Sequence, residues 1–319
     1  MAAEHVEQLE LFPFGNIREV LNLPPPPPLR PSDALRAAFR PFSEYMQAKE
    51  FTANTIKAFL NDMNLLAEYL GEKATLEDCS THKLEGFLHW LRYERDAPCS
   101  LRSLDRRITT LKVFFQWLAD HHVLPDNPAE PLAHYGAASP LPEILSDAQL
   151  DALLHLTRSM RDASESPDAR PHLLLTLLLD TAIKKAECLR IRLEHLDLSD
   201  LNQPSVYIHY EKPRQRFKQR RLALGAEFVP TFELYMRRYQ PKERLFECTG
   251  RNLEYVLHNI SDLARLGTRV TFEMLRWTSA VRSYKAGMDA ERLRRRLGLS
   301  QIAWHGTWPI LQKLAEGPL

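Results

Sequence analysis

Apolar residues in the region that begins near residue 33 recur every three or four positions, which is the spacing of one face of an α-helix. The pattern predicts four helices, at about 35–46, 56–70, 81–93 and 101–121. Gly71 directly after the second helix is a typical stop signal. Four amphipathic helices in so short a stretch make a compact bundle.

A second helical region begins at Ser146, which together with Gln149 can form a capping box around the first turn of a helix. Two short runs, Val206–Ile208 and Leu222–Leu224, interrupt this region and are predicted strands joined by a charged connection. Prolines punctuate the stretch 125–145, as in linkers between domains. The sequence thus predicts a mainly α-helical protein with a helical domain over 33–124, a linker over 125–145, and a second domain over 146–319 with a small β-hairpin.

The first 32 residues are predicted to be a flexible tail. Five consecutive prolines, Pro24 to Pro28, favour polyproline II and act as a stiff spacer. Before them, Gln8, Leu9, Leu11 and Phe12 resemble the short peptide with which bacterial replication and repair proteins bind the sliding clamp. The alternative is a segment that packs on its own domain, since five residues match easily by chance.

Composition limits the class of protein. With 319 residues and 44% apolar content, the chain can build two hydrophobic cores. Its longest mainly apolar run, Leu173 to Leu179, is too short to cross a membrane, and the acidic start lacks a secretory signal. The four cysteines lie far apart, without metal-binding or disulfide spacing. We therefore expect a cytoplasmic protein without metal or cofactor.

The net charge is only +1, so contacts with nucleic acid must come from local clusters of cations. The connection between the predicted strands carries a cation at every second position: Lys212, Arg214, Arg216, Lys218 and Arg220. In an extended segment all five project from one side, which suits a phosphate backbone and predicts salt-dependent binding. The alternative is a solvated loop. Four arginines between 292 and 296, on a predicted helix, are a weaker signal.

The order of these parts resembles the tyrosine recombinases, also called the phage integrase family. Five segments carry the resemblance: Asn54–Lys57 in the second helix, Leu111–Leu118 in the fourth, Asp126–Ala129 in the linker, Thr181–Glu187, and Met274-Leu-Arg-Trp277. It implies a four-helix core-binding domain of SAM-like fold, followed by a domain with the catalytic fold, which together clamp duplex DNA. In the first domain the candidate phosphate contacts are Lys57, Arg102, Arg106 and Arg107, and in the second the hairpin cations, Lys184 and Arg276.

The resemblance also assigns six chemical positions, and four of them are altered here. Lys184 stands where the family has an arginine, Glu273 and Leu299 stand where it has histidines, and Trp308 stands where it has the nucleophilic tyrosine. Lys212 and Arg276 match residues of the family pattern. Lysine keeps the charge of arginine but loses the planar fork that binds two phosphoryl oxygens. Indole has no nucleophilic oxygen. Because such groups act as a unit, we expect that the site no longer cleaves DNA, although its remaining cations can bind a phosphate.

Other residues near the nucleophile position are Tyr284, Ser300 and His305, and none has an evident activating base beside it. The sequence therefore predicts an accessory or regulatory clamp on double-stranded DNA. Further expected partners are an active recombinase, a second copy bound through the amphipathic tail Ile310–Leu314, and the sliding clamp. Two alternatives stay open: a divergent but active site-specific recombinase, and a protein-interaction scaffold that does not bind DNA.

Overall fold

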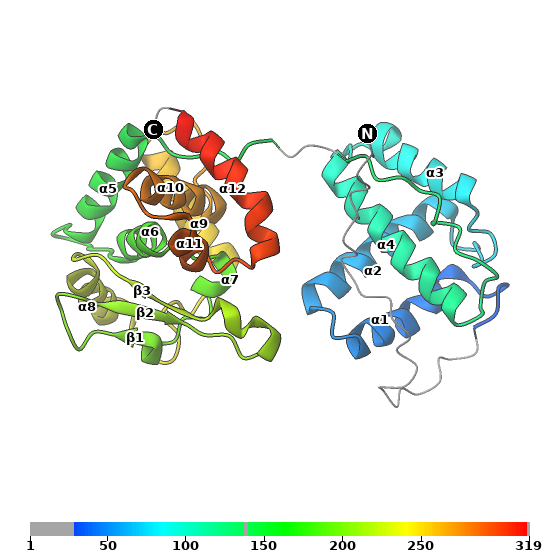
Figure 1. The fold of residues 1–319 in the computed structure, drawn as a ribbon, viewed down its shortest axis with the longest axis horizontal. Helices are drawn as coiled ribbons and strands as arrows, with labels where there is room; N and C mark the ends of the chain where they lie inside the picture. The colour runs from blue at the N-terminus through cyan, green and yellow to red at the C-terminus, as the bar shows by residue number, and fades with distance from the viewer. Residues whose placement is uncertain (1–28, 137–139, 318–319) are drawn as a thin grey trace, which may run out of the picture. The chain divides into compact units, whose positions relative to one another are not determined.

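The computed structural model describes residues 29–136 and 140–317, so the clamp-like peptide Gln8–Phe12 and the polyproline run lie outside the described residues. The chain divides into two compact units between Ser139 and Pro140 (Figure 1). Both units are mainly helical, and each has its own hydrophobic core.

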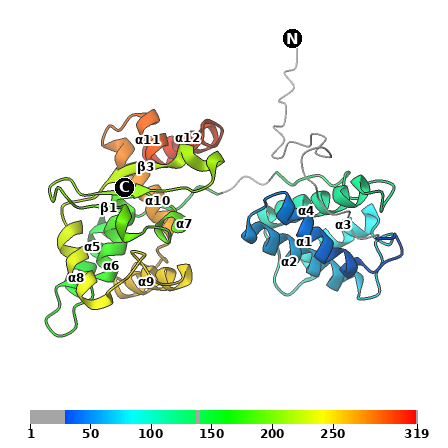
Figure 2. The same ribbon diagram turned by 90° about the horizontal axis from the view of Figure 1, so that it is seen from below.

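The first unit is a helical bundle, seen from two directions in Figure 1 and Figure 2. Its helices are α1 (Phe39–Ala48), α2 (Ala53–Leu70), α3 (Thr81–His89) and α4 (Leu101–Asp120), with a 3-10 turn η2 (Leu35–Ala38) before α1 and a π-helical turn η3 (Trp90–Glu94) after α3. Thr52, Ser80 and Ser100 cap the starts of α2, α3 and α4, since each side chain accepts a backbone N–H three residues further on. The four predicted helices are confirmed.

Aromatic rings fill the core of this bundle. Phe42 of α1 and Phe114 of α4 are fully buried, and their ring centroids lie 5.0 Å apart, edge to face. Trp117 is also buried and lies 5.4 Å from Phe42. Aromatic pairs in this geometry add to the stabilisation that comes from burial alone.

Much of the expected linker packs on the two units instead of connecting them freely. Ala129 and Leu132 are buried in the core of the first unit, and the Thr81 hydroxyl donates to the carbonyl of Pro128 at 2.8 Å. Leu145 is buried in the core of the second unit. The predicted linker over 125–145 is therefore too long, because these apolar side chains gain more by leaving water than the prolines alone indicate.

The second unit surrounds one buried helix. Its helices are α5 (Asp147–Arg161), α6 (Arg170–Thr181), α7 (Lys185–Cys188), α8 (Phe228–Tyr239), α9 (Gly250–Leu263), α10 (Phe272–Lys285), α11 (Ala290–Arg296) and α12 (Gln301–Glu316), with 3-10 turns η4 (Leu193–His195) and η5 (Pro213–Lys218). Helix α6 packs against α5, α8, α9 and α10, and eight of its twelve residues are buried. The predicted capping box of Ser146 and Gln149 is present at the start of α5.

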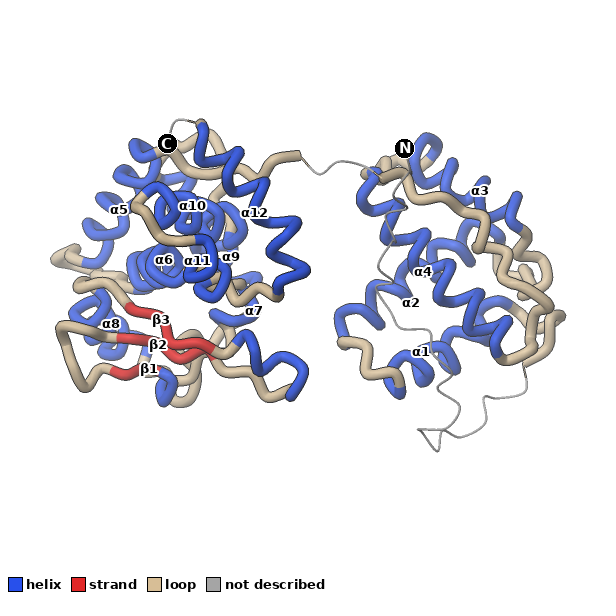
Figure 3. The backbone as a smooth tube through the Cα atoms, in the orientation of Figure 1, coloured by secondary structure: helices blue, strands red, loops and turns tan. Residues whose placement is uncertain are grey.

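A small antiparallel sheet completes this unit (Figure 3). Its strands are β1 (Leu196–Asp197), β2 (Ser205–Ile208) and β3 (Arg220–Ala223), in the order β1-β2-β3. Val206 pairs with Leu196 on one side and with Leu222 on the other. The two predicted strands are confirmed, whereas β1, with two residues, is too short to show a periodic pattern.

One buried carboxylate, Asp62 of α2, joins α2 to α4. Arg106 donates to both of its oxygens, with the Nη2–Oδ1 distance at 2.8 Å, and the Thr110 hydroxyl donates to Oδ2 at 2.8 Å. The Nε atom of Arg107 lies 3.3 Å from Oδ1. The Asp62 side chain is only 2% exposed, so the stability of its charge depends on these partners.

Replacing Asp62 with Ala should lower the free energy of unfolding by about 3 kcal/mol, because Arg106 and the buried Thr110 hydroxyl lose their acceptor and Arg107 loses its counterion. Urea denaturation of the full chain, followed by circular dichroism, measures this change. Glu68→Ala is the matched control, since Glu68 is an exposed carboxylate on the same helix, and we expect an effect below about 0.5 kcal/mol. An equally small effect of Asp62→Ala would contradict the structural role given to Asp62.

Candidate functional site

A buried carboxylate, that of Glu187 on α7, organises the candidate site. Arg220 of β3 binds its two oxygens at 2.9 and 3.0 Å, and the Tyr210 hydroxyl donates to it at 2.7 Å. The backbone N–H of Lys184 donates to the same carboxylate at 2.8 Å. Burial by itself raises the pKa of Glu187, but Arg220 and the other donors outweigh burial and lower this pKa to about 2. Segments that are distant in the sequence thus meet at one ionised group.

Arg220 is occupied inside the protein, where the sequence predicted a phosphate contact. Besides binding Glu187, its Nε atom donates to the carbonyl of Arg296 at 2.7 Å, and its side chain is 9% exposed. Gly298 packs directly against it, because a Cβ atom there would lie 2.6 Å from Nη1 of Arg220. The φ of +60° at Gly298 also favours glycine. Arg220 therefore holds the base of the hairpin to α7 and α11.

The connection between β2 and β3 is not extended, which corrects the prediction that its cations project from one side. Residues 213–218 form the 3-10 turn η5, in which side chains three residues apart lie over one another. Pro213 starts the turn with its fixed φ, and the N–H of Gln215 donates to the carbonyl of Lys212 at 2.8 Å. The side chains of Arg214, Arg216 and Lys218 consequently diverge.

Several cations gather beside Glu187. Arg276 of α10 is 8% exposed, and its guanidinium donates to the carbonyls of Ala182 and Leu297, the latter at 2.7 Å. Burial lowers the pKa of Arg276 to about 10. Desolvation lowers the pKa of Lys184, and the charges of Arg276 and Lys218 lower it further, while Glu187 opposes them. More positive than negative groups meet here, so the cluster suits an anion.

The structure brings Lys218 to this cluster, whereas the sequence match selected Lys212. The Nζ atom of Lys218 lies 5.6 Å from the centroid of the Tyr210 ring, and the hydroxyl of that ring binds Glu187. Lys212 is exposed at the start of η5. Sequence reasoning missed Tyr210 and the role of Glu187, although Glu187 closes the Thr181–Glu187 segment that marks Lys184.

Glu273, one of the altered positions, pairs with another residue of α10. The indole N–H of Trp277 donates to Oε1 of Glu273 at 2.8 Å, across one helical turn. A hydrogen-bonded acid thus occupies the place where the sequence match expects a histidine.

Trp308 of α12 lies in an apolar cluster. Its ring centroid is 5.2 Å from that of Tyr284, edge to face, and 5.2 Å from that of Trp304 (tilted rings). Leu299 packs in the same cluster. The position expected to hold a nucleophile is therefore occupied by a packed indole.

Ser300, His305 and Tyr284 are the other residues near the nucleophile position. Ser300 caps α12, because its hydroxyl accepts the N–H of Ala303 at 3.2 Å, and His305 is exposed. Tyr284 follows Arg276 on α10 by eight residues, which is about 12 Å along the helix axis. The backbone of Tyr284 is thus displaced from that of Arg276 by about two turns of α10.

Comparisons with known proteins agree with this arrangement. Residues 40–122 match the model of the phage integrase N-terminal SAM-like domain. The chain is 26% identical over 280 residues to tyrosine recombinase XerC of Oceanobacillus iheyensis, covering 82% of this chain and 87% of that protein. It is 24% identical over 283 residues to tyrosine recombinase XerD of Listeria innocua, covering 83% and 91%. Over most of its length the chain is thus similar to tyrosine recombinases.

Solved structures of tyrosine recombinases share the fold. XerH bound to a palindromic difH substrate, in a post-cleavage complex, has a TM-score of 0.68 at 17% identity and covers 88% of this chain and 82% of its own. A lambda integrase dimer bound to a COC' core site has a TM-score of 0.66 at 14% identity, with 86% and 77% covered. The fold is therefore that of the tyrosine recombinases, mainly helical with a SAM-like first domain.

The cations predicted in the SAM-like domain differ in accessibility. Lys57 and Arg102 are exposed. Arg106 and Arg107 bind Asp62, and Arg107, which is 12% exposed, also contacts the Sγ atom of Cys99. Arg106 keeps 42% of its side chain exposed despite its ion pair. Only two of the four predicted contacts thus extend into solvent without a carboxylate partner among the described residues.

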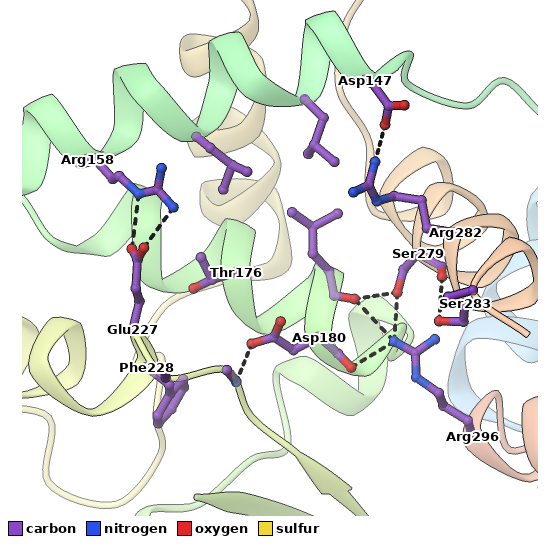
Figure 4. A pocket seen from close by; sticks show the side chains of 16 residues that line it. Asp147, Arg158, Thr176, Asp180, Glu227, Phe228, Ser279, Arg282, Ser283 and Arg296 are labelled. Atoms are coloured by element: carbon purple, nitrogen blue, oxygen red, sulfur yellow. Dashed lines mark hydrogen bonds and ion pairs between the residues drawn. The ribbon is translucent and has the colours of Figure 1, made fainter. Parts of the chain in front are cut away.

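Three of the four arginines of α11 are also engaged within the protein, as Figure 4 shows for Arg296 beside an open pocket of about 820 Å³. Arg296 donates to the carbonyl of Asp180 at 2.7 Å and to the Ser279 hydroxyl at 2.8 Å. Arg294 and Arg295 each bind Glu291. These bonds explain why this run of arginines is a weak sign of nucleic-acid binding.

Among residues 29–136 and 140–317, no helix is both long and apolar enough to span a bilayer. The same residues contain no group of three or more His, Cys, Asp or Glu side chains arranged to hold a metal ion. All four cysteines are free thiols.

Replacing Glu187 with Gln should change how stability depends on pH. The folded pKa of Glu187 is about 2, below its ordinary value of 4.5, so its contribution is complete above pH 4.5 and is lost as the pH falls towards 2. Over this range the wild-type chain should lose up to about 3 kcal/mol of unfolding free energy that Glu187→Gln does not lose. Urea denaturation at a series of pH values measures the difference.

The matched control is Glu233→Gln, which removes an exposed carboxylate from α8 and should keep the wild-type pH dependence. If Glu187→Gln also keeps that dependence, the ion pair with Arg220 does not stabilise the fold in the way described.

Proposed function

We propose that this chain is a DNA-binding protein of tyrosine-recombinase fold that does not cleave DNA and acts as an accessory or regulatory clamp on duplex DNA. The observation that carries this proposal is Trp308 at the nucleophile position, packed against Tyr284 and Trp304. Indole has one N–H donor and no nucleophilic oxygen, so it cannot form a covalent link to a phosphate.

The other altered positions support the loss of cleavage. Lys184 carries a charge but cannot bind two phosphoryl oxygens as a planar guanidinium does. Arg276 already donates to two backbone carbonyls. Glu273 would repel a phosphate, and its carboxylate accepts from Trp277. Since catalytic groups act together, these changes reinforce the effect of Trp308.

Retained cations support DNA binding. Lys212, Arg214 and Arg216 are exposed on the hairpin, and Lys57 and Arg102 are exposed on the first unit. Lys184 and Lys218 add positive charge beside Arg276. XerH and lambda integrase, which share the fold, were solved on DNA, the latter as a dimer. We extend duplex binding to this chain on these grounds. Four further points stay predictions: binding of an active recombinase, self-association through 310–314, binding of the sliding clamp through Gln8–Phe12, and a cytoplasmic location.

A divergent active recombinase is the second candidate, because one observation favours it. The ring of Tyr284 contacts Trp308, so a tyrosine lies next to the nucleophile position although it belongs to another helix. Its distance along α10 from Arg276 argues against it. A covalent trapping experiment separates the two candidates.

A nicked genomic fragment that the protein retains can serve as a suicide substrate, since cleavage next to the nick releases a short strand and traps any covalent complex. The full chain should give no covalent adduct on a denaturing gel, while an active tyrosine recombinase on its own nicked site serves as the positive control. An adduct that disappears in Tyr284→Phe would overturn the proposal in favour of an active enzyme.

Replacing Arg214, Arg216 and Lys218 together with Ala should weaken duplex binding. The slope of log affinity against log salt should flatten by about one unit for each lost phosphate contact. Replacing Arg237, Lys242 and Arg269 with Ala removes the same charge from exposed positions outside the hairpin and should have a much smaller effect. Equal effects of the two sets would refute the hairpin interface, and absent or salt-insensitive binding by the wild type would favour a protein scaffold.

A further inference from the structure

Phe217 is an exposed aromatic residue in the basic connection between β2 and β3. Its side chain is 57% exposed, and it belongs to none of the apolar clusters formed by the described residues. It lies near the end of the turn η5, which connects β2 and β3. A single exposed aromatic ring is common on protein surfaces, so the groups beside Phe217 decide what its position implies.

The cations around Phe217 indicate the chemistry of that partner. In a 3-10 turn, residues three apart share a side, so Arg214 lies on the side of Phe217 while Arg216 and Lys218 lie on the other two sides. The Nζ atom of Lys218 is 5.4 Å from the centroid of the Phe217 ring. An apolar ring with positive charges on diverging sides is complementary to stacked bases between two phosphate chains.

Hydrogen bonds at the base of the hairpin fix the turn that carries Phe217. The side-chain amide of Gln219 donates to the carbonyl of Tyr210 at 2.8 Å, across the base of the hairpin. Arg220, the next residue, is fixed by Glu187 and by the carbonyl of Arg296. Lys218 lies between the rings of Phe217 and Tyr210. A ring on such a support loses little conformational freedom when it binds.

We propose that Phe217 is a wedge that enters duplex DNA from the minor groove and partly separates two adjacent base pairs. Apolar side chains that insert in this way unstack a base step and bend the duplex toward the major groove. The minor groove is only about 6 Å wide, so cations that diverge around the ring reach the phosphates on both of its sides. Pyrimidine–purine steps, which unstack easily, are the preferred sites.

This inference rests on the proposed duplex binding, and it adds a way to choose and bend a site without a hydrogen bond to a base. The probe is a duplex about three helical turns long with TpA steps, 2-aminopurine at one of these steps, and a pair of fluorescent dyes at its ends. Binding of the full wild-type chain should raise 2-aminopurine fluorescence and shorten the distance between the dyes.

Phe217→Ala should abolish both signals and weaken binding roughly tenfold, equivalent to about 1.4 kcal/mol. The slope of affinity against salt should stay that of the wild type, because no phosphate contact is lost. Phe217→Leu should keep most of both signals, since leucine also serves as a wedge. Tyr255→Ala, which removes an aromatic ring that is 55% exposed on α9, should behave as the wild type.

Two results would overturn the inference, and they are distinguishable. If the wild type binds the duplex with a salt-dependent affinity but Phe217→Ala leaves both fluorescence signals unchanged, the wedge is wrong while the proposed DNA binding stands. If the wild type does not bind the duplex at all, both are wrong, and Phe217 belongs to a protein contact.

Discussion

The ion pair between Glu187 and Arg220 is the interaction on which the functional face of the second unit depends. Both side chains are almost fully buried, and two buried charges are tolerated only when their geometry and hydrogen bonds are good. Glu187 also accepts hydrogen bonds from the backbone N–H of Lys184 and from the hydroxyl of Tyr210. Arg220 also donates to the backbone carbonyl of Arg296 in α11. The position of Lys184, the base of the hairpin and the direction of its tip follow from this one contact.

Residues at positions where the resemblance implies catalytic groups take part in packing and pairing. Glu273 accepts from Trp277, and Trp308 packs against Tyr284 and Trp304 in a cluster that also holds Leu299. Each replacement therefore has partners that stabilise the folded chain. The proposed loss of cleavage fits this arrangement, because the scaffold remains supported where catalytic groups would otherwise stand.

Arginines of this chain have two different uses that their sequence context does not separate. Arg106 and Arg220 each bind a buried carboxylate from a segment far away in the chain, Asp62 and Glu187 respectively. Arg102, by contrast, is exposed. Because a buried arginine needs its carboxylate partner, only the exposed cations can bind DNA phosphates without weakening the fold.

The sequence by itself determined the four helices of the first unit, the start of α5 with the capping box of Ser146 and Gln149, the two longer strands, the family resemblance and the indole at position 308. These features depend on local periodicity, on capping within one turn and on the match of short motifs, all of which act over neighbouring residues. Only the tertiary structure decided that Arg220 is internal, that Lys218 joins the cationic cluster, and that residues 213–218 turn instead of extending. The reason is physical: whether a cation is free depends on which carboxylate the fold brings to it, and that partner lies dozens of residues away.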